Sequence, residues 1–286
     1  MSIIELTSLY TEPFINFAKV YEYKSISFIS RVYQNKNLII PPSKIAKVFC
    51  EVSDSNPNII KNALMITSGG ILMPIFSDKQ PSHIVIFKLI KKVLHYKNKI
   101  YCILGIKKDT EYLKKYLNYS LYSTIDYSLL TENFNKKYYM DKTPLKVKKA
   151  NKRDTLILFS LEKAYLLEEV LGENSEINHQ AAFLNLKKTC TYQSVFYGLI
   201  DKKIIAKVNT NGQGFSYNQI GGVYTKPEYR NQGISTYLMK ILINEIHSLG
   251  KNAVLYVKKG NKPALTLYKN LGFHIISDYS AHYIIK

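Results

Sequence analysis

Residues 221–236 are the most informative part of the chain and read Gly221-Gly222-Val223-Tyr224-Thr225-Lys226-Pro227-Glu228-Tyr229-Arg230-Asn231-Gln232-Gly233-Ile234-Ser235-Thr236. The pattern predicts that a strand ends, a loop turns and a helix begins within a few residues. The first N–H groups of a helix have no partner inside it and carry the positive end of its dipole, so they bind phosphate oxygens. Gly233 would let an anion approach the backbone, and Arg230 adds a positive charge. The stretch therefore predicts a phosphate-binding loop.

The sequence on either side of this loop predicts a complete α/β unit. Apolar residues at helical spacing precede it, alternating apolar residues indicate strands, and Gly and Pro mark the turns. The expected helices are 155–171, 176–189, 234–249 and a last one from Pro263 to Leu271. The expected strands are 193–200, 203–209, 215–225, 252–257, 273–279 and 281–285.

The first half of the chain shows a similar order of elements. Strands are expected at 44–52, 63–67, 71–77 and 99–106, with helices at 83–95 and 110–117, the second one capped by Asp109. A polar, lysine-rich segment, 133–154, separates the two halves. The repeated order predicts two copies of one architecture.

Two signatures in this sequence resemble those of the GNAT superfamily of acyl-CoA-dependent N-acyltransferases. Arg230-Asn231-Gln232-Gly233-Ile234-Ser235 resembles the pyrophosphate loop R/Q-x-x-G-x-G/A, with Ser235 where glycine or alanine is usual. The second signature follows in the right order, with Asn261, Ala264, Tyr268 and Gly272-Phe273. The resemblance covers about 155–286.

The resemblance implies an α/β (α+β) fold class with two GNAT-like domains, each a mixed, mostly antiparallel sheet flanked by helices. The expected division is a degenerate N-terminal domain at 1–140, a linker at 141–154 and an acetyltransferase domain at 155–286. The place equivalent to the pyrophosphate loop is expected at 100–117 in the first half. Because 100–117 contains no R-x-x-G-x-G/S, the first half would shape the acceptor pocket instead of binding cofactor.

The resemblance also implies an activity: transfer of an acetyl group from acetyl-CoA, with no metal, to an amine that attacks the thioester directly. The strand 215–225 would diverge from 252–257 and admit the pantetheine arm. The N–H of Val223 would polarise the acyl carbonyl, and Tyr268 would serve as general acid for the leaving thiolate. The residues expected to bind acetyl-CoA are Val223, Tyr224, Thr225, Arg230, Asn231, Gln232, Gly233, Ile234, Ser235 and Asn261.

No general base is evident, because the strand 215–225 contains no acidic residue. Glu168, Glu176 and His179 lie on the early helices and are interpreted as solvated helix residues. Cys190 is interpreted as a packing residue and not as a nucleophile.

Composition sets the remaining expectations. The net charge of +19 is carried almost entirely by lysine, since arginine occurs only at Arg31, Arg153 and Arg230. Specific nucleic-acid readers depend on arginine, so nucleic acid is not expected as a partner. A cytoplasmic location is expected from three widely spaced cysteines, and no membrane association is expected because the longest apolar stretch is short and interrupted. The expected partner is a small-molecule or peptide amine, and a homodimer is left open.

Three alternatives compete with an N-acetyltransferase. A Fem-like aminoacyltransferase also uses two GNAT-like halves, but with charged tRNA, and does not need the CoA loop. A non-catalytic module that binds acyl-CoA would not need Tyr268. A nucleic-acid-binding protein is suggested by the net charge alone.

Overall fold

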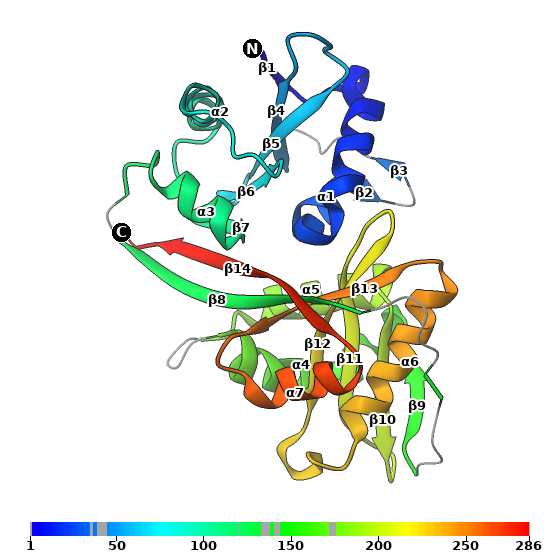
Figure 1. Cartoon of the computed structure of the whole chain (residues 1–286). Helices are drawn as coiled ribbons and strands as arrows, with labels where there is room; N and C mark the ends of the chain where they lie inside the picture. Colours follow the sequence, from blue (N-terminus) through cyan, green and yellow to red (C-terminus); the bar gives the residue numbers. More distant parts are fainter. Residues whose placement is uncertain are drawn as a thin grey trace.

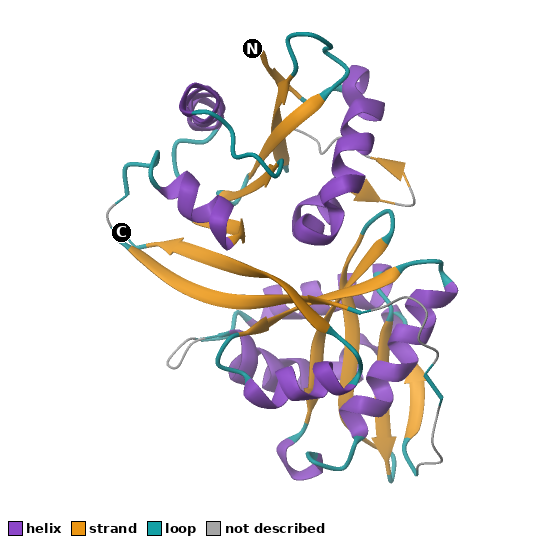
Figure 2. Ribbon diagram, viewed as in Figure 1, coloured by secondary structure: helices purple, strands orange, loops and turns teal. Residues whose placement is uncertain are grey.

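The computed structural model describes residues 2–34, 37–38, 45–119, 121–132, 138–139, 144–171 and 176–285. Both halves contain helices and strands, and helices flank the strands (Figure 2). Of the expected linker, 141–143 lie outside the described residues, and the strand Lys146–Lys149 follows. None of the helices formed by the described residues has the length and apolar character needed to cross a membrane.

The first half contains three α-helices and the first eight strands among its described residues. In chain order these elements are β1 Ser2–Glu5, η1 Ser8–Tyr10, α1 Thr11–Val32, β2 Tyr33–Gln34, β3 Asn37–Leu38, β4 Ala46–Val52, β5 Ile60–Thr67, β6 Ile71–Phe76, α2 His83–Tyr96, β7 Cys102–Ile106, α3 Lys107–Lys114 and β8 Tyr122–Thr131.

The second half repeats this order with one additional helix before its central strands. Its elements are β9 Lys146–Lys149, η2 Lys152–Asp154, α4 Thr155–Tyr165, η3 Leu166–Val170, α5 His179–Tyr192, β10 Val195–Ile200, β11 Lys203–Gln213, β12 Tyr217–Thr225, η4 Pro227–Tyr229, α6 Ile234–Ser248, β13 Asn252–Lys258, α7 Lys262–Asn270 and β14 His274–Ile284. The prediction of two copies of one architecture is confirmed.

Twelve strands of the described residues form one sheet, in the order β1-β4-β5-β6-β7-β14-β8-β13-β12-β11-β10-β9. In each half, four antiparallel strands stand side by side, and the fourth also pairs in parallel with a fifth strand. The parallel pairs are β6 with β7 and β12 with β13. The arrangement is a mixed, mostly antiparallel sheet, as expected.

The two halves exchange their last strands. Strand β8 of the first half pairs with β13 of the second, while β14 of the second half pairs with β7 of the first. The two exchanged strands also pair with each other and form a long ribbon between the halves (Figure 1). Each parallel pair is therefore completed by a strand from the other half, and the sheet is continuous across the whole chain.

Helix α6 covers the sheet of the second half and fixes the loop that precedes it. Its inward face is a stripe of buried apolar residues at helical spacing. The helix packs against β10, β11, β12 and β13. The buried stripe consists of Leu238, Met239, Leu242, Ile243 and Ile246.

Two sequence expectations were wrong, and several elements, among them α1 and β8, were not predicted. The ranges 273–279 and 281–285 are not two strands, because β14 runs unbroken with one register shift between Ile275 and Ser277. Asp109 does not cap α3, which begins two residues earlier at Lys107. Helix α1 was missed altogether: a kink at Ser25 interrupts its helical pattern.

Helix α1 also links the two halves. The buried Glu22 carboxylate accepts hydrogen bonds from the N–H groups of Ser216 (3.0 Å) and Tyr217 (3.3 Å), at the start of β12. Burial raises the pKa of Glu22, while these N–H groups oppose that shift. The strand that leads into the candidate site is thus anchored to the first half.

Candidate functional site

Strands β12 and β13 pair only at their beginnings. Tyr217–Ile220 lie opposite Asn252–Leu255 in parallel register. Both strands continue, to Thr225 and Lys258, with no further pairing between them among the described residues. The expected divergence is therefore present, and the edge of β12 after Ile220 faces an opening and not a neighbouring strand.

This opening leads into a cavity of about 990 Å³. The cavity is lined in the second half by β11, β12, the loop after it, the first turn of α6, the end of α4, η3, β13 and α7. The exchanged strands β8 and β14, together with β7 and Ser27 of α1, form its remaining wall. The cavity thus extends from the loop before α6 to the junction of the two halves.

The start of α6 has the open geometry that the sequence predicts. Gly233 is its N-cap and adopts a left-handed φ of 73°. A Cβ atom built on Gly233 would meet nothing within 4 Å, so the space beside this backbone is open. The Ser235 hydroxyl hydrogen-bonds the Thr225 hydroxyl at 2.7 Å, which fixes the first turn of α6 to the end of β12. An anion can approach the first N–H groups of this helix.

Arg230 is paired with an acid instead of standing alone in the loop. Its Nη2 lies 2.6 Å from Glu168 Oε1, and its Nε donates to the carbonyl of Thr225 at 3.0 Å. The Tyr224 hydroxyl donates to the same Glu168 carboxylate at 3.1 Å. Glu168, interpreted from sequence as a solvated residue, therefore ties the loop to η3, and the Arg230 charge is paired with a carboxylate.

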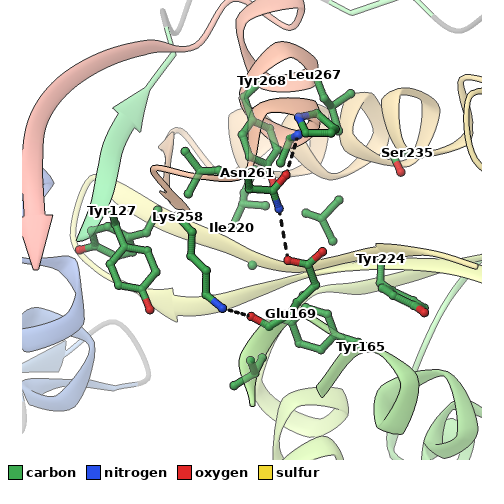
Figure 3. A pocket seen from close by; sticks show the side chains of 18 of the residues that line it. Tyr127, Tyr165, Glu169, Ile220, Tyr224, Ser235, Lys258, Asn261, Leu267 and Tyr268 are labelled. Atoms are coloured by element: carbon green, nitrogen blue, oxygen red, sulfur yellow. Dashed lines mark hydrogen bonds between the residues drawn. The ribbon is translucent and has the colours of Figure 1, made fainter. Parts of the chain in front are cut away.

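Asn261 has two partners at the start of α7. Its Oδ1 accepts from the N–H of Ala264 at 3.0 Å, which makes it the N-cap of the helix. Its Nδ2 donates to Glu169 Oε2 at 3.2 Å. Figure 3 shows the Glu169 carboxylate pointing toward the Asn261 amide, with Tyr268 beside it.

Glu169 is the functional candidate that sequence reasoning missed. It lies in η3, a π-helical turn closed by a hydrogen bond from Leu171 N–H to the carbonyl of Leu166 (2.8 Å). Lys258 Nζ donates to the Glu169 carbonyl at 2.7 Å and holds this turn against β13. The signal in the sequence for an acid at this site is the pair Glu168-Glu169 at the end of a helical pattern. Helical periodicity does not predict which of the two side chains points into the cavity.

Tyr268 lines the cavity from α7 and is 7% exposed. Burial raises the pKa of its hydroxyl, and nearby Tyr165 and Glu169 raise it further, because a phenolate there would be poorly solvated and close to negative charge. Tyr268 is therefore held in its protonated, hydrogen-donating form.

Most of the predicted binding residues come together at this cavity. Gln232 is the exception: it does not line the cavity, and its amide contacts the Glu228 carbonyl at 3.5 Å. Cys190 is buried away from the cavity, and burial raises the pKa of its thiol, in keeping with a packing residue. The predicted residues that do line the cavity are Val223, Tyr224, Thr225, Arg230, Asn231, Gly233, Ile234, Ser235, Asn261 and Tyr268.

A buried lysine of β11 contacts the backbone of β12 at Gly222. Lys207 on β11 is 1% exposed, and its Nζ donates to the carbonyl of Gly222 at 3.1 Å. The same ammonium lies 2.9 Å from Glu162 Oε2 and over the ring of Tyr165. Gly222 has φ 57°, and a Cβ there would lie 2.0 Å from Asn209 Oδ1. The glycine and the ion pair together fix the backbone next to Val223.

We expect Lys207→Met to lower the free energy of unfolding by about 3 kcal/mol, because it leaves the Glu162 carboxylate without its buried partner. Urea denaturation measures this loss. The double variant Lys207→Met/Glu162→Gln removes the stranded charge and should recover most of the stability. Equal losses in the single and double variants would show that the ion pair is not the cause.

Comparison with known proteins supports this description. Residues 197–281 match the family model "FR47-like protein". A solved tandem GNAT protein from the clavulanic acid biosynthesis pathway superposes with a TM-score of 0.62 at 8% identity, covering 98% of this chain and 97% of that one. The chain has a tandem GNAT fold. A GNAT-family acetyltransferase from Colwellia psychrerythraea (TM-score 0.54, 13% identity, 100% of both chains) is also similar. So is a Drosophila protein (TM-score 0.68, 9% identity, 99% of this chain and 98% of that one). No curated protein sequence matches significantly.

The GNAT fold of the first half corrects the predicted position of its missing cofactor loop. Since β6 pairs with β7 as β12 pairs with β13, the loop equivalent to the one before α6 lies between β6 and α2, at 77–82, and not within 100–117. That loop reads Ser-Asp-Lys-Gln-Pro-Ser and has no glycine. In the first half, Pro74 packs on Gly105 of β7, with 3.1 Å from Pro74 Cδ to the place of a Cβ atom. A proline ring thus lies where the strands of this GNAT half begin to diverge.

Proposed function

We propose that this protein is an acetyl-CoA-dependent N-acetyltransferase. The observation that carries the proposal is the divergence of β12 from β13 directly beside the open N-terminus of α6, both facing one cavity. An extended chain that ends in a diphosphate requires a strand edge with free backbone groups followed by a site for phosphate oxygens. An edge of β12 without a neighbouring strand after Ile220, followed by the open N-terminus of α6, supports the proposal.

Different residues of the cavity would bind different parts of acetyl-CoA. The first N–H groups of α6, after Gly233, would hold the pyrophosphate, and the free edge of β12 at Val223, Tyr224 and Thr225 would pair with the pantetheine arm. Asn231, Gln232, Ile234 and Ser235 would complete the loop, with Arg230 at its side. Asn261 would act mainly by capping α7, which carries Tyr268.

The chain's own residues would then supply electrostatic and acid catalysis. When bound, acetyl-CoA supplies an activated thioester. The N–H of Val223, held in place by the Gly222–Lys207 contact, would donate to the acetyl oxygen as negative charge develops there. Tyr268, kept protonated by burial, would give its proton to the departing sulfur. The role of general acid requires that the Tyr268 phenol still carries its proton at neutral pH.

Domain limits and location belong to the same proposal. The first half, 1–140, would contribute the acceptor wall, the segment 141–154 would connect the halves, and 155–286 would hold acetyl-CoA. The three free, buried cysteines fit a reducing cytoplasm. The acceptor would be a small-molecule or peptide amine.

The test is a thermal melt with and without acetyl-CoA. At about 100 times its dissociation constant, a ligand that binds only the folded state stabilises it by about 2.7 kcal/mol. For a chain of this size we expect the melting temperature to rise by roughly 5 °C. An unchanged melting temperature at saturating acetyl-CoA would reject the proposal, and retention on tRNA at physiological salt would favour the Fem-like alternative.

A further inference from the structure

One carboxylate in the cavity is available for a substrate. Among the described residues that line the cavity, the acids are Glu168 and Glu169. Glu168 is engaged by Arg230 and Tyr224. Glu169 has a neutral partner, the Asn261 amide, at 3.2 Å. A carboxylate with a neutral partner in a half-buried site retains the capacity to bind a cation and to accept a proton.

The π turn separates the roles of these two neighbouring acids. An extra residue in one turn rotates the chain after it, and such turns are frequent at functional sites. In η3 this directs Glu168 toward Arg230 and Glu169 toward Asn261. Tyr165 at the end of α4 and Tyr268 on α7 are the titratable groups beside Glu169, and Lys258 on β13 binds its carbonyl. Glu169 is thus placed near the proposed general acid, on a backbone held from two sides.

The far wall of the cavity has a different chemistry. It is formed by aromatic and aliphatic side chains from β7, β8, β13 and β14, including Tyr127, Tyr256, Tyr279 and Tyr283. Tyr256 and Tyr279 pack together with their ring centroids 4.3 Å apart. Arg31 of α1 interacts with both of these tyrosines and donates to the carbonyl of Ser27. The far wall therefore suits an apolar or aromatic body. Since no acid lines it among the described residues, a second ammonium group would find no carboxylate there.

We propose that the acceptor is a primary monoamine with an apolar or aromatic body, whose ammonium group is received and deprotonated by Glu169. This inference rests on the proposed acetyl transfer and names its acceptor class and general base. The body would lie against the tyrosines of the exchanged strands, so both halves would contribute to one acceptor site.

The proton balance of the reaction is complete with these residues. The ammonium gives one proton to the Glu169 carboxylate, which passes it to water. The freed nitrogen forms the C–N bond with the acetyl carbon, the C–S bond breaks, and Tyr268 gives its proton to sulfur. The second proton leaves the nitrogen as the amide forms and returns to Tyr268 through solvent. One proton is released for each amide made.

The test compares wild type with Glu169→Gln, using acetyl-CoA and phenethylamine as the probe, followed by thiol release. We expect Glu169→Gln to lower kcat/KM at pH 7 by roughly tenfold or more, as for loss of a general base. The ratio of wild type to variant should shrink as pH rises toward the pKa of the free amine, because an amine that arrives deprotonated needs no base. A merely structural defect would not give this convergence.

The controls separate this inference from the proposed function. Glu176→Gln changes an exposed acid outside the cavity and should leave turnover unchanged. The acetyl-CoA melting shift should persist in Glu169→Gln, since Glu169 is not assigned to the cofactor. Cadaverine, a diamine, should react more slowly than phenethylamine.

Three outcomes would overturn the inference. Equal kcat/KM for wild type and Glu169→Gln across the pH range would remove Glu169 as the base. A preference for cadaverine would contradict the monoamine class. A wild type that shows the acetyl-CoA shift but does not acetylate phenethylamine would reject this acceptor class while leaving the proposed function intact.

Discussion

Gly233→Glu is expected to abolish the rise in melting temperature that acetyl-CoA produces. The substitution puts a carboxylate into the open space beside the first turn of α6, where a Cβ meets nothing within 4 Å. The new side chain would occupy the place of the pyrophosphate and repel it, and it would itself satisfy the dipole and free N–H groups of the helix. The measurement is the difference in melting temperature with and without acetyl-CoA, taken against the variant's own ligand-free value.

Gly250→Glu is the matched control at the other end of the same helix. Gly250 also has a left-handed backbone, with φ 70° against 73° at Gly233, and a Cβ there also meets nothing within 4 Å. A residue with a Cβ costs roughly 1–2 kcal/mol in this conformation at either position. Gly250→Glu should lose more ligand-free stability than Gly233→Glu, because its carboxylate lies at the negative end of the helix dipole. Gly250→Glu should keep the acetyl-CoA shift. A full shift in Gly233→Glu would place the diphosphate elsewhere and contradict the proposed cofactor site.

The parts of the fold and site that the sequence predicted are those with local causes. Gly233, Ser235 and the apolar stripe of α6 specify a strand, loop and helix over a short stretch, and the structure places all three as expected. Asn261 and Tyr268 share one short helix, so their common position at the cavity also follows from local spacing. Short-range patterns of this kind depend little on the rest of the chain.

The features that escaped prediction depend on contacts between distant residues. Nothing local to β8 or β14 indicates that each pairs with the other half, because strand pairing is decided by the whole sheet. Helix α1 has a buried face that only its packing on the sheets explains. The roles of Glu168 and Glu169 depend on a π turn, which helical periodicity does not reveal.

The same reasoning explains why the predicted position of the missing loop in the first half is wrong. The segment of β7 and α3 has the same strand-turn-helix pattern as the segment of β12 and α6. Only the parallel pairing of β6 with β7 shows that the equivalent of β12 is β6. Position in the sheet, which the linear order does not specify, decides which loop corresponds to which.

Tyr268→Phe is expected to lower kcat by roughly 100-fold, the contribution typical of a positioned general acid. The change removes one hydroxyl and keeps the buried ring against Phe273. KM for acetyl-CoA and the acetyl-CoA melting shift should stay close to wild type, because the hydroxyl is assigned to the reaction and not to cofactor binding. Steady-state thiol release with the fastest primary amine of a small panel measures kcat and KM separately.

The pH dependence of the wild type gives an independent check on Tyr268. Its pKa is raised, so the acid form persists as pH rises and is lost only when pH passes that raised value. We therefore expect no decline of kcat between pH 7 and about 9, where a group with an ordinary tyrosine pKa would begin to lose its proton. A falling kcat in that range would show that the proton donor is a different, more acidic group.

Tyr33→Phe is the control for removing a phenol from a buried tyrosine. Tyr33 is 8% exposed, against 7% for Tyr268, but it lies in the first half against Phe215, away from the cavity. It should leave kcat unchanged. If Tyr268→Phe had the kcat of wild type, the sulfur would have to take its proton from solvent. Tyr268 would then not be the general acid, while the proposed binding of acetyl-CoA in the cavity would stand. If both variants lost activity equally, the cause would be a general loss of packing, because the two positions share burial and little else.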